Sequence, residues 1–396
     1  MKKNLLFVID SLAIAGAEKS LVTLLSLLDL SKFNVDLQLF AHGNKLEELI
    51  PKEINVLSPL RYTIFTQKRV KDNLIHSFSM DNYKMLLSRI KYSSKIRLKK
   101  YSNPQKARIF WQSVSGVIEK NPKTYDVAIS YAQGVPTFYV AEKVKAKKKL
   151  AWVNVSYRLT EKDKEFQKKY YDLYDKIVGV SESTKEIFLE TFPEYRNKLE
   201  VIFDINNPQF ISDMADVGNG YEDYFDGVRV LTIGRLARQK GYDIALKACK
   251  SLKEKGINFR WYVLGKGPLE EEIRQYVATH GLTDHFILLG VKANPYPYIK
   301  KSDIYVQTSK FEGFGLAIAE ARMLNVPVVT TNFDAVYNQM VQNKNGLVVN
   351  MDSESVADGI INLIHNHNLR NEITEYLKHE KKGNVEEIEK FYNLVI

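Results

Sequence analysis

Cysteine is almost absent from this sequence, and long apolar runs are missing altogether. Among 396 residues Cys249 is the single cysteine, which excludes an intrachain disulfide and a zinc site built from cysteines and fits a reducing compartment. No stretch approaches the roughly 20 consecutive apolar residues of a membrane-spanning helix. Apolar residues at 45 % and charged residues at 26 % are ordinary for a globular protein and exclude a disordered or fibrous chain.

Three motifs of well-known catalytic sites are also missing. The chain has no Asp-x-Asp, so a metal-bridged nucleotide site has no obvious ligand. It has no Gly-x-x-x-x-Gly-Lys-Ser/Thr, the phosphate cradle of P-loop kinases, and no Gly-x-Ser-x-Gly nucleophile elbow. We therefore expect neither a resident metal ion nor a resident cofactor.

The first residues have some features of a signal peptide, because Lys2 and Lys3 precede an apolar run at residues 5–9. Asp10 ends that run below the length of about seven to fifteen residues that a signal peptide needs. A buried parallel strand is the better interpretation. We expect a cytoplasmic protein, with peripheral contact to the inner face of the cell membrane as an open alternative.

The positive charge is concentrated in one segment. The chain carries 57 Lys and Arg against 47 Asp and Glu, a formal net charge of +10. Residues 68–108 hold twelve of these cations but only two acids, Asp72 and Asp81, so this segment accounts for the whole excess. One interpretation is a solvated face, and the other is a surface for polyanions, either anionic lipid head groups or nucleic acid.

An amphipathic helix is predicted inside this basic segment. Four apolar residues follow the helical spacing i, i+3, i+4, i+7 and are flanked by cations: Tyr83, Leu86, Leu87 and Ile90. The helix either packs on its own domain or lies on an anionic membrane. Nucleic-acid binding would need aromatic residues interleaved with the charges, and Tyr92 and Tyr101 offer little of that, so we expect no nucleic-acid partner.

Short apolar runs alternate with helical patterns along most of the chain, which predicts parallel sheets covered by helices on both faces. The first run, at residues 5–9, leads into a small-residue loop around Gly16 and a helical pattern at residues 18–28. A polar stretch at residues 205–227 predicts a linker, after which the alternation restarts. The predicted fold class is α/β, with two doubly wound Rossmann-like domains whose strands end at a central cleft.

Two cations follow a strand in the second half. Gly234 and Arg235 come directly after that strand, and Lys240 stands where the next helix begins. Such a pair suits a diphosphate, because arginine can engage two oxygens at once. The following strand also ends in a tight glycine turn, which starts at Gly265.

A third glycine loop, at residues 311–321, leads from a strand into a helix. Its glycines permit close approach of a ligand, and the helix N-terminus offers free amides to phosphate or sugar oxygens. Glu312 precedes the helix, and Glu320 lies about one turn inside it, roughly 6 Å along the axis from Leu316. Two carboxylates can thus contact two parts of one bound ligand.

In combination, these loops and the two glutamates resemble the group 1 retaining glycosyltransferases (family four, GT-B fold) of bacterial surface-polysaccharide synthesis. The resemblance is dense over residues 228–362, thinner over 1–40 and 125–206, and weak over 43–108.

Three parts of the chain are implied by this resemblance. Residues 1–206 would form an acceptor-binding domain with a basic helical insert at about 68–108. Residues 207–377 would bind the nucleotide-sugar donor. A C-terminal helix within residues 378–396 would pack back on the N-terminal domain.

The resemblance also implies residue roles. Arg235 and Lys240 would hold the donor's diphosphate and stabilise the leaving nucleotide, with Glu312 facing the donor sugar. Glu320 would bind the ribose hydroxyls of the nucleotide. The remaining donor-binding positions would act largely through their backbone: Gly16, Gly234, Gly265, Phe314, Gly315 and Leu316.

Three positions depart from the family's pattern. Asn154 stands where a His is frequent, and Asn cannot shuttle protons near neutrality, so we place it in the acceptor or sugar pocket rather than as a base. Gln339 replaces a frequent Glu, and Asp204 replaces a common Asn.

The implied activity is that of a hexosyltransferase. It would transfer a sugar with retention from a nucleoside diphosphate sugar, UDP-linked, to a hydroxyl of a lipid-linked or surface glycan, without a metal ion. The basic segment suggests that the acceptor is met at an anionic membrane. The alternative is a non-catalytic GT-B subunit that binds or stabilises a partner transferase.

Overall fold

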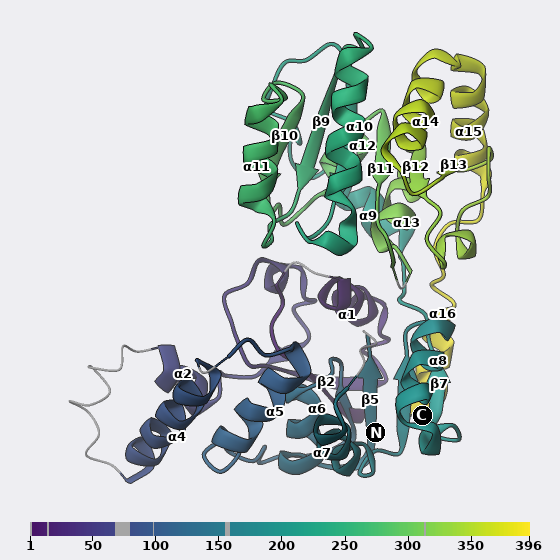
Figure 1. The fold of residues 1–396 in the computed structure, drawn as a ribbon. Coiled ribbons are helices and arrows are strands. Elements are labelled where there is room, and N and C mark those ends of the chain that lie inside the picture. The colour runs from purple at the N-terminus through teal and green to yellow at the C-terminus, as the bar shows by residue number, and fades with distance from the viewer. Residues whose placement is uncertain (1, 14–15, 68–79, 98, 155–158, 313) are drawn as a thin grey trace. The chain divides into compact units, whose positions relative to one another are not determined.

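The computed structural model describes residues 2–13, 16–67, 80–97, 99–154, 159–312 and 314–396 (Figure 1). They form two compact units. The first comprises Met1–Asp204 together with Glu386–Ile396, and the second comprises Ile205–Val385. The N-terminal part of the predicted basic insert, residues 68–79, lies outside the described residues.

The first unit is built on a seven-stranded parallel sheet of order β3-β2-β1-β4-β5-β6-β7. Five consecutive apolar residues of β1, at positions 5–9, are at most 1 % exposed, as expected for a parallel sheet covered on both faces. The strands are β1 (Lys3–Ile9), β2 (Phe33–Leu39), β3 (Asn55–Val56), β4 (Thr124–Ser130), β5 (Lys145–Val153), β6 (Lys176–Gly179) and β7 (Leu199–Val201).

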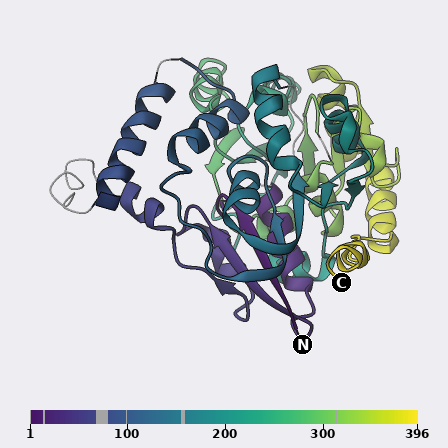
Figure 2. The ribbon, with the colours of Figure 1, turned by 90° about the horizontal axis from the view of Figure 1, so that it is seen from below.

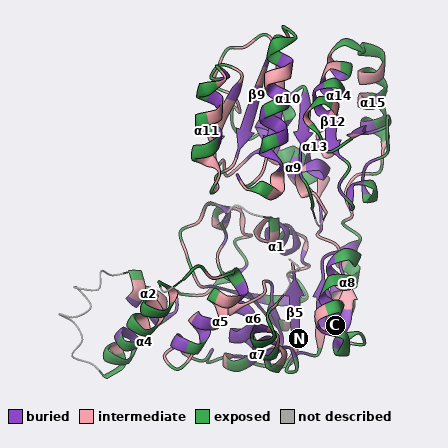
Figure 3. Ribbon diagram, viewed as in Figure 1, coloured by how far each residue is buried: buried purple, intermediate pink, exposed green. Residues whose placement is uncertain are grey.

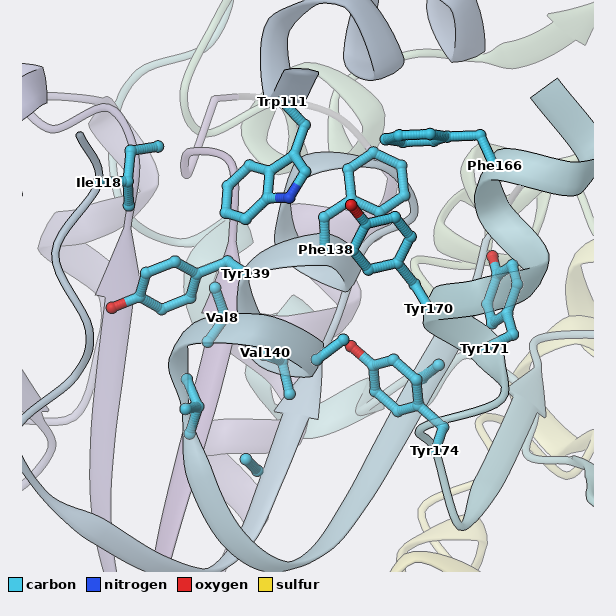
Figure 4. Close-up of a cluster of buried hydrophobic side chains, with 14 of the residues drawn as sticks. Val8, Trp111, Ile118, Phe138, Tyr139, Val140, Phe166, Tyr170, Tyr171 and Tyr174 are labelled. Carbon is cyan, nitrogen blue, oxygen red and sulfur yellow. The ribbon is translucent and has the colours of Figure 1, made fainter. Parts of the chain in front are cut away.

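Helices cover this sheet, and an aromatic cluster fills the space beneath several of them (Figure 4). Tyr170, Tyr171 and Tyr174 belong to this cluster. The helices are α1 (Gly16–Leu27), α2 (Arg61–Gln67), α4 (Met80–Ile96), α5 (Asn103–Val114), α6 (Val135–Lys143), α7 (Glu161–Tyr171), α8 (Glu182–Thr191) and α16 (Glu387–Val395).

The C-terminal helix α16 packs on the first unit. Phe391 stacks on Phe7 of β1 with ring centroids 5.9 Å apart. Lys3 Nζ donates a hydrogen bond to the carbonyl oxygen of Ile396 at 2.5 Å. The chain end is thus fixed to the strand that begins the fold.

The second unit contains a six-stranded parallel sheet of order β10-β9-β8-β11-β12-β13. Its strands are β8 (Val228–Ile233), β9 (Phe259–Leu264), β10 (Phe286–Gly290), β11 (Ile304–Gln307), β12 (Val328–Thr331) and β13 (Gly346–Val349). Its helices are α9 (Pro208–Ala215), α10 (Tyr242–Glu254), α11 (Glu270–Thr279), α12 (Tyr296–Lys300), α13 (Leu316–Met323), α14 (Ser353–His365) and α15 (His367–His379).

The linker predicted at residues 205–227 is wrong for its first part. Asn207 caps helix α9 by accepting hydrogen bonds from two backbone amides of the first turn. Ile211 and Ala215 of this helix are buried in the second unit's core. The asparagine and proline that suggested a loop are a helix-start signal, so this segment belongs to the second unit.

The apolar stripe predicted on α4 is only partly buried (Figure 3). Met85 and Leu86 are buried, and α4 packs along α5 (Figures 1 and 2). Tyr83, Leu87 and Ile90, in contrast, are about half exposed. The amphipathic helix is therefore confirmed, but its stripe is buried only at Leu86.

Within the described ranges, no helix combines the length and the apolar character that crossing a membrane requires. Cys249 lies in the second unit's core on α10, fully buried.

Candidate functional site

The carboxyl ends of three neighbouring strands bring the predicted loops of the second unit together. β8 pairs with β9 on one side and with β11 on the other. The loop that starts at Gly234 follows β8, the loop that starts at Gly265 follows β9, and the loop that contains Glu312 follows β11. Because the strands are parallel, the three loops meet at one edge of the sheet.

Two glycines allow these loops to touch. Gly265 has φ +156°, and a Cβ atom there would lie 1.9 Å from the carbonyl oxygen of Gly234. Gly241 has φ +66°, and its Cβ would lie 1.8 Å from the carbonyl oxygen of Thr308. Any side chain at either position would push two strand-end loops apart.

Lys240 and Glu312 form an ion pair between Nζ and Oε1, although the sequence analysis gave them separate roles. The aliphatic stem of Lys240 lies against the backbone of Gly234. The Lys240 side chain is 21 % exposed and that of Glu312 is 10 % exposed. The pair is therefore partly shielded from water. In such an environment two charges interact more strongly than at an open surface.

Glu312 Oε1 receives two further hydrogen bonds. Gln307 donates from Nε2 at 2.9 Å, and Ser309 donates from Oγ at 2.7 Å. The Tyr305 hydroxyl donates to Gln307 Oε1 at 2.5 Å. The sequence analysis missed these three residues. The signal was available, since Gln307, Thr308 and Ser309 form a polar run at the end of an otherwise apolar strand.

Arg235 lies on the same loop as Lys240 but differs in its surroundings. Its side chain is exposed, and it forms no ion pair or hydrogen bond with any residue that the structure describes. Of the two cations predicted for the diphosphate, Lys240 is thus neutralised by Glu312 and Arg235 is available to an anion.

Helix α13 begins at the same edge. Gly315 is its N-cap, and the backbone N–H groups of the first turn have no partner within the helix. Glu320 is 4 % exposed and accepts a hydrogen bond from the Tyr296 hydroxyl at 3.1 Å. Burial and the nearby Glu320 carboxylate raise the pKa of Tyr296 well above its ordinary value, so this hydroxyl remains a donor.

Gln339 supports the start of α13. Its Nε2 contacts the carbonyl oxygen of Phe314 and donates to the carbonyl oxygen of Gly315 at 3.2 Å. Because C=O and N–H point in opposite directions across a peptide, these contacts turn the N–H groups of Gly315 and Leu316 away from Gln339. The glutamate that the resemblance leads one to expect at 339 would offer no donor here when ionised.

The other two predicted site residues lie in the first unit. Gly16, predicted in a loop, instead opens helix α1, while residues 14 and 15 lie outside the described residues. That correction reflects the ambiguity of a small-residue run, which suits a loop or a first helical turn. Asn154 follows β5 and donates from Nδ2 to the carbonyl oxygen of Tyr131 at 2.6 Å.

Ser20, Tyr131 and Asp204 form a buried network in the first unit. Ser20 Oγ donates to Asp204 Oδ1 at 2.6 Å and lies 2.9 Å from the Tyr131 hydroxyl. Burial raises the pKa of Asp204 to about 6, and the hydrogen bond from Ser20 offsets part of that rise.

Residues 225–380 match the model of the family described as glycosyl transferases group 1. The chain is 26 % identical over 202 residues to the N-acetylgalactosamine-N,N'-diacetylbacillosaminyl-diphospho-undecaprenol 4-alpha-N-acetylgalactosaminyltransferase of Campylobacter jejuni, across 50 % of this chain and 53 % of that protein. It is 27 % identical over 236 residues to the capsular polysaccharide biosynthesis glycosyltransferase CapM of Staphylococcus aureus, across 55 % and 61 %. The chain thus spans about half the length of these curated relatives.

Among solved structures, HepE of Anabaena in complex with UDP and glucose matches 99 % of this chain and 98 % of that chain, with a TM-score of 0.67 and 16 % identity. This likeness establishes the fold. The protein has the two-domain GT-B architecture, as the alternation of strands and helices predicted. Residues 225–380 match the group 1 glycosyl transferase model, in agreement with the family resemblance of the strand-end loops.

Proposed function

We propose that this protein is a glycosyltransferase that moves a hexosyl group from a UDP-linked sugar to an acceptor hydroxyl with retention of configuration. One observation carries the proposal: the guanidinium of Arg235, which has no partner among the residues that the structure describes, lies on the same strand-end loop as Lys240 of the Lys240–Glu312 pair. This arrangement falls within the part of the chain that matches the group 1 family model.

Cleavage of a sugar–diphosphate bond places negative charge on the departing phosphate oxygens. Arg235 is available to bind those oxygens, and Lys240 can share its ammonium between them and Glu312. Two cations supply the charge for which other transferases use a metal ion. We therefore propose metal-independent transfer, in which the leaving phosphate also takes the acceptor proton on the same face.

The remaining groups would position the donor. The N–H groups of Gly315 and Leu316, turned away from Gln339, would bind phosphate or sugar oxygens. Glu320 would accept hydrogen bonds from the ribose hydroxyls, with Tyr296 holding its carboxylate. Gly234 and Gly265 would let the two loops close beneath the nucleotide.

We propose that the acceptor binds in the first unit, with Asn154 in its pocket. The names of the two curated relatives, one acting on an undecaprenol-linked glycan and one in capsule synthesis, support a lipid-linked or surface glycan as acceptor.

The described part of the basic insert supports a peripheral contact with anionic lipid. One face of α4 carries four apolar side chains, each at least 48 % exposed: Met80, Tyr83, Leu87 and Ile90. Exposed cations surround this face: Lys84, Lys91, Lys95 and Arg97. Exposed apolar residues between cations are the pattern of a helix that lies in a membrane interface.

Vesicle sedimentation tests this contact. Each cation near an anionic surface adds about 1 kcal/mol, so changing Lys84, Lys91, Lys95 and Arg97 together to Gln should abolish binding to vesicles that contain phosphatidylglycerol. Binding by the wild type should weaken above physiological salt. A matched variant with four Gln in the second unit, at Arg274, Arg370, Lys378 and Lys381, should still sediment. Equal binding by the α4 variant would make this face a solvated surface.

Donor use tests the main proposal. A panel of UDP-sugars is incubated with the chain and a lipid-linked acceptor, and UDP release is measured with and without excess chelator. We expect release with at least one donor, in both conditions. A donor that stabilises the chain thermally, by about 2.7 kcal/mol at 100 times its Kd, but is never turned over would favour the non-catalytic subunit instead.

A further inference from the structure

Gln307 is the last residue of β11, and its side chain is enclosed by the protein. It is 2 % exposed, and Tyr305 and Ser309 beside it are both fully buried. Because side chains alternate along a strand, Tyr305 and Gln307 point to the same face of the sheet. An amide at this depth is costly unless each of its polar groups has a partner.

Every polar group of the Gln307 amide is used. Oε1 accepts from the Tyr305 hydroxyl at 2.5 Å, and the contact with the Glu312 carboxylate identifies the other amide atom as the donor nitrogen. Nε2 has two hydrogens, and it donates to Ser309 Oγ at 2.7 Å and to Glu312 Oε1 at 2.9 Å. A carboxylate at this position would lack both donors, and an aliphatic side chain would lack the acceptor as well.

The donors on Glu312 all converge on one oxygen. Gln307, Ser309 and Lys240 reach Oε1, while Oε2 receives no hydrogen bond from any residue within the described ranges. Three donors from three directions fix both the position and the rotation of the carboxylate. One oxygen is held by the protein, and the other is presented to whatever binds the site.

We infer that Gln307 is a positioning residue for sugar transfer: it holds the Glu312 carboxylate in the orientation that presents Oε2 to the donor sugar. This inference rests on the proposed function, in which Glu312 faces that sugar. Positioning a charged group within a few tenths of an ångström matters more in the transition state than in the bound donor. The effect of Gln307 should therefore fall on turnover.

The test is a double-mutant cycle. Gln307→Met keeps the volume and removes the amide, and it should lower kcat by roughly 10- to 100-fold, the value of one hydrogen bond to a charged group, with KM changed less than about threefold. In a Glu312→Ala background, the same substitution should have no further effect on kcat, because Gln307 acts only through that carboxylate. If Gln307 only stabilised the fold, Gln307→Met would lower kcat by the same factor with Glu312 present or replaced by Ala. That result would overturn the inference.

Gln342→Met is the matched control. The side-chain oxygen of Gln342 accepts a hydrogen bond from the Val348 N–H at 2.7 Å, also within the second unit. Unlike Gln307, Gln342 is exposed and has no hydrogen bond with Glu312. We expect it to leave kcat unchanged. An equal fall in kcat for both glutamine variants would assign the effect to loss of stability and reject the positioning role.

A second cycle separates this inference from the proposed function. Unfolding free energies of the wild type, Gln307→Met, Glu312→Ala and the double variant report the coupling between the two side chains without any transfer reaction. We expect the single losses to be non-additive. If the two unfolding losses are non-additive but the chain transfers no sugar, only the proposed function is rejected. If the two losses are additive, the inference is rejected even if the chain transfers sugar.

Discussion

Arg235 and Lys240 follow the same strand, yet only Lys240 has its charge compensated. The carboxylate of Glu312 contacts the Lys240 ammonium, while the guanidinium of Arg235 is exposed and has no anionic partner among the described residues. In the protein without a ligand, Lys240 therefore contributes an ion pair to the structure, whereas Arg235 contributes none among the described residues.

Arg235→Ala should damage activity but not the fold. Removal of one preorganised electrostatic contact typically costs 10²–10³ in turnover, and we expect a loss of roughly that size in UDP release. The melting temperature should stay at the wild-type value, because an exposed side chain without partners adds little to stability. Lys247→Ala removes an exposed cation of α10 and should leave both quantities unchanged. Near-normal turnover by Arg235→Ala would remove this residue from the diphosphate site.

Lys240→Ala, in contrast, should lower activity and stability together. It leaves the largely buried Glu312 carboxylate with two neutral donors and no cation, which we expect to cost about 1–3 kcal/mol in urea unfolding. Adding Glu312→Gln to this variant removes the uncompensated charge, so stability should recover while turnover does not. A Lys240→Ala variant as stable as the wild type would mean that the ion pair contributes nothing to the fold.

The two glutamates should separate in steady-state kinetics. Glu320→Ala should mainly raise KM for the donor, since a ribose contact is made equally in the ground state and in the transition state. Glu312→Ala should mainly lower kcat. Glu320→Gln retains the hydrogen bond from the Tyr296 hydroxyl and should lie between Glu320→Ala and the wild type. The reverse pattern would exchange the roles of the two residues.

Asp204 should make the first unit less stable as the pH rises. Its pKa is about 6 in the folded protein and about 4 when unfolded, so the folded state binds the additional proton between these values. The stabilising effect of protonation is complete below pH 4 and is lost as the pH passes 6. A shift of about two pKa units corresponds to about 3 kcal/mol.

Asp204→Asn isolates this contribution. The amide oxygen can still accept the hydrogen bond from Ser20, but the side chain no longer titrates. In urea unfolding, the two proteins should have similar stability at pH 4, and the variant should become the more stable one above pH 6. Parallel stability curves from pH 4 to pH 7 would show that Asp204 does not titrate in this range.

Much of the fold and of the strand-end loops followed from the sequence, because they depend on short-range patterns. Apolar runs, glycines and helix starts recur in order, so the parallel sheets and the loops at Gly234, Gly265 and Gly315 could be predicted. The contacts made by Gln307 could not, since they join residues through side-chain directions that spacing does not encode.

The errors had the same origin. The segment containing α9 looked like a linker because its capping asparagine and proline also favour turns, and tertiary packing of Ile211 decided the outcome. The stripe on α4 is buried only at Leu86, because the spacing i, i+3, i+4, i+7 predicts an apolar face but not which of its edges packs on the domain.

The single thiol of this chain is a ready-made reporter of unfolding. Cys249 is enclosed in the second unit, and burial raises the pKa of its thiol to about 12, so a maleimide or disulfide reagent should not modify it in the native protein. Its labelling rate therefore measures how often that half of the molecule opens, separately from the other half. The same inertness lets one engineered surface cysteine carry a fluorophore at a chosen position, without first removing the natural one.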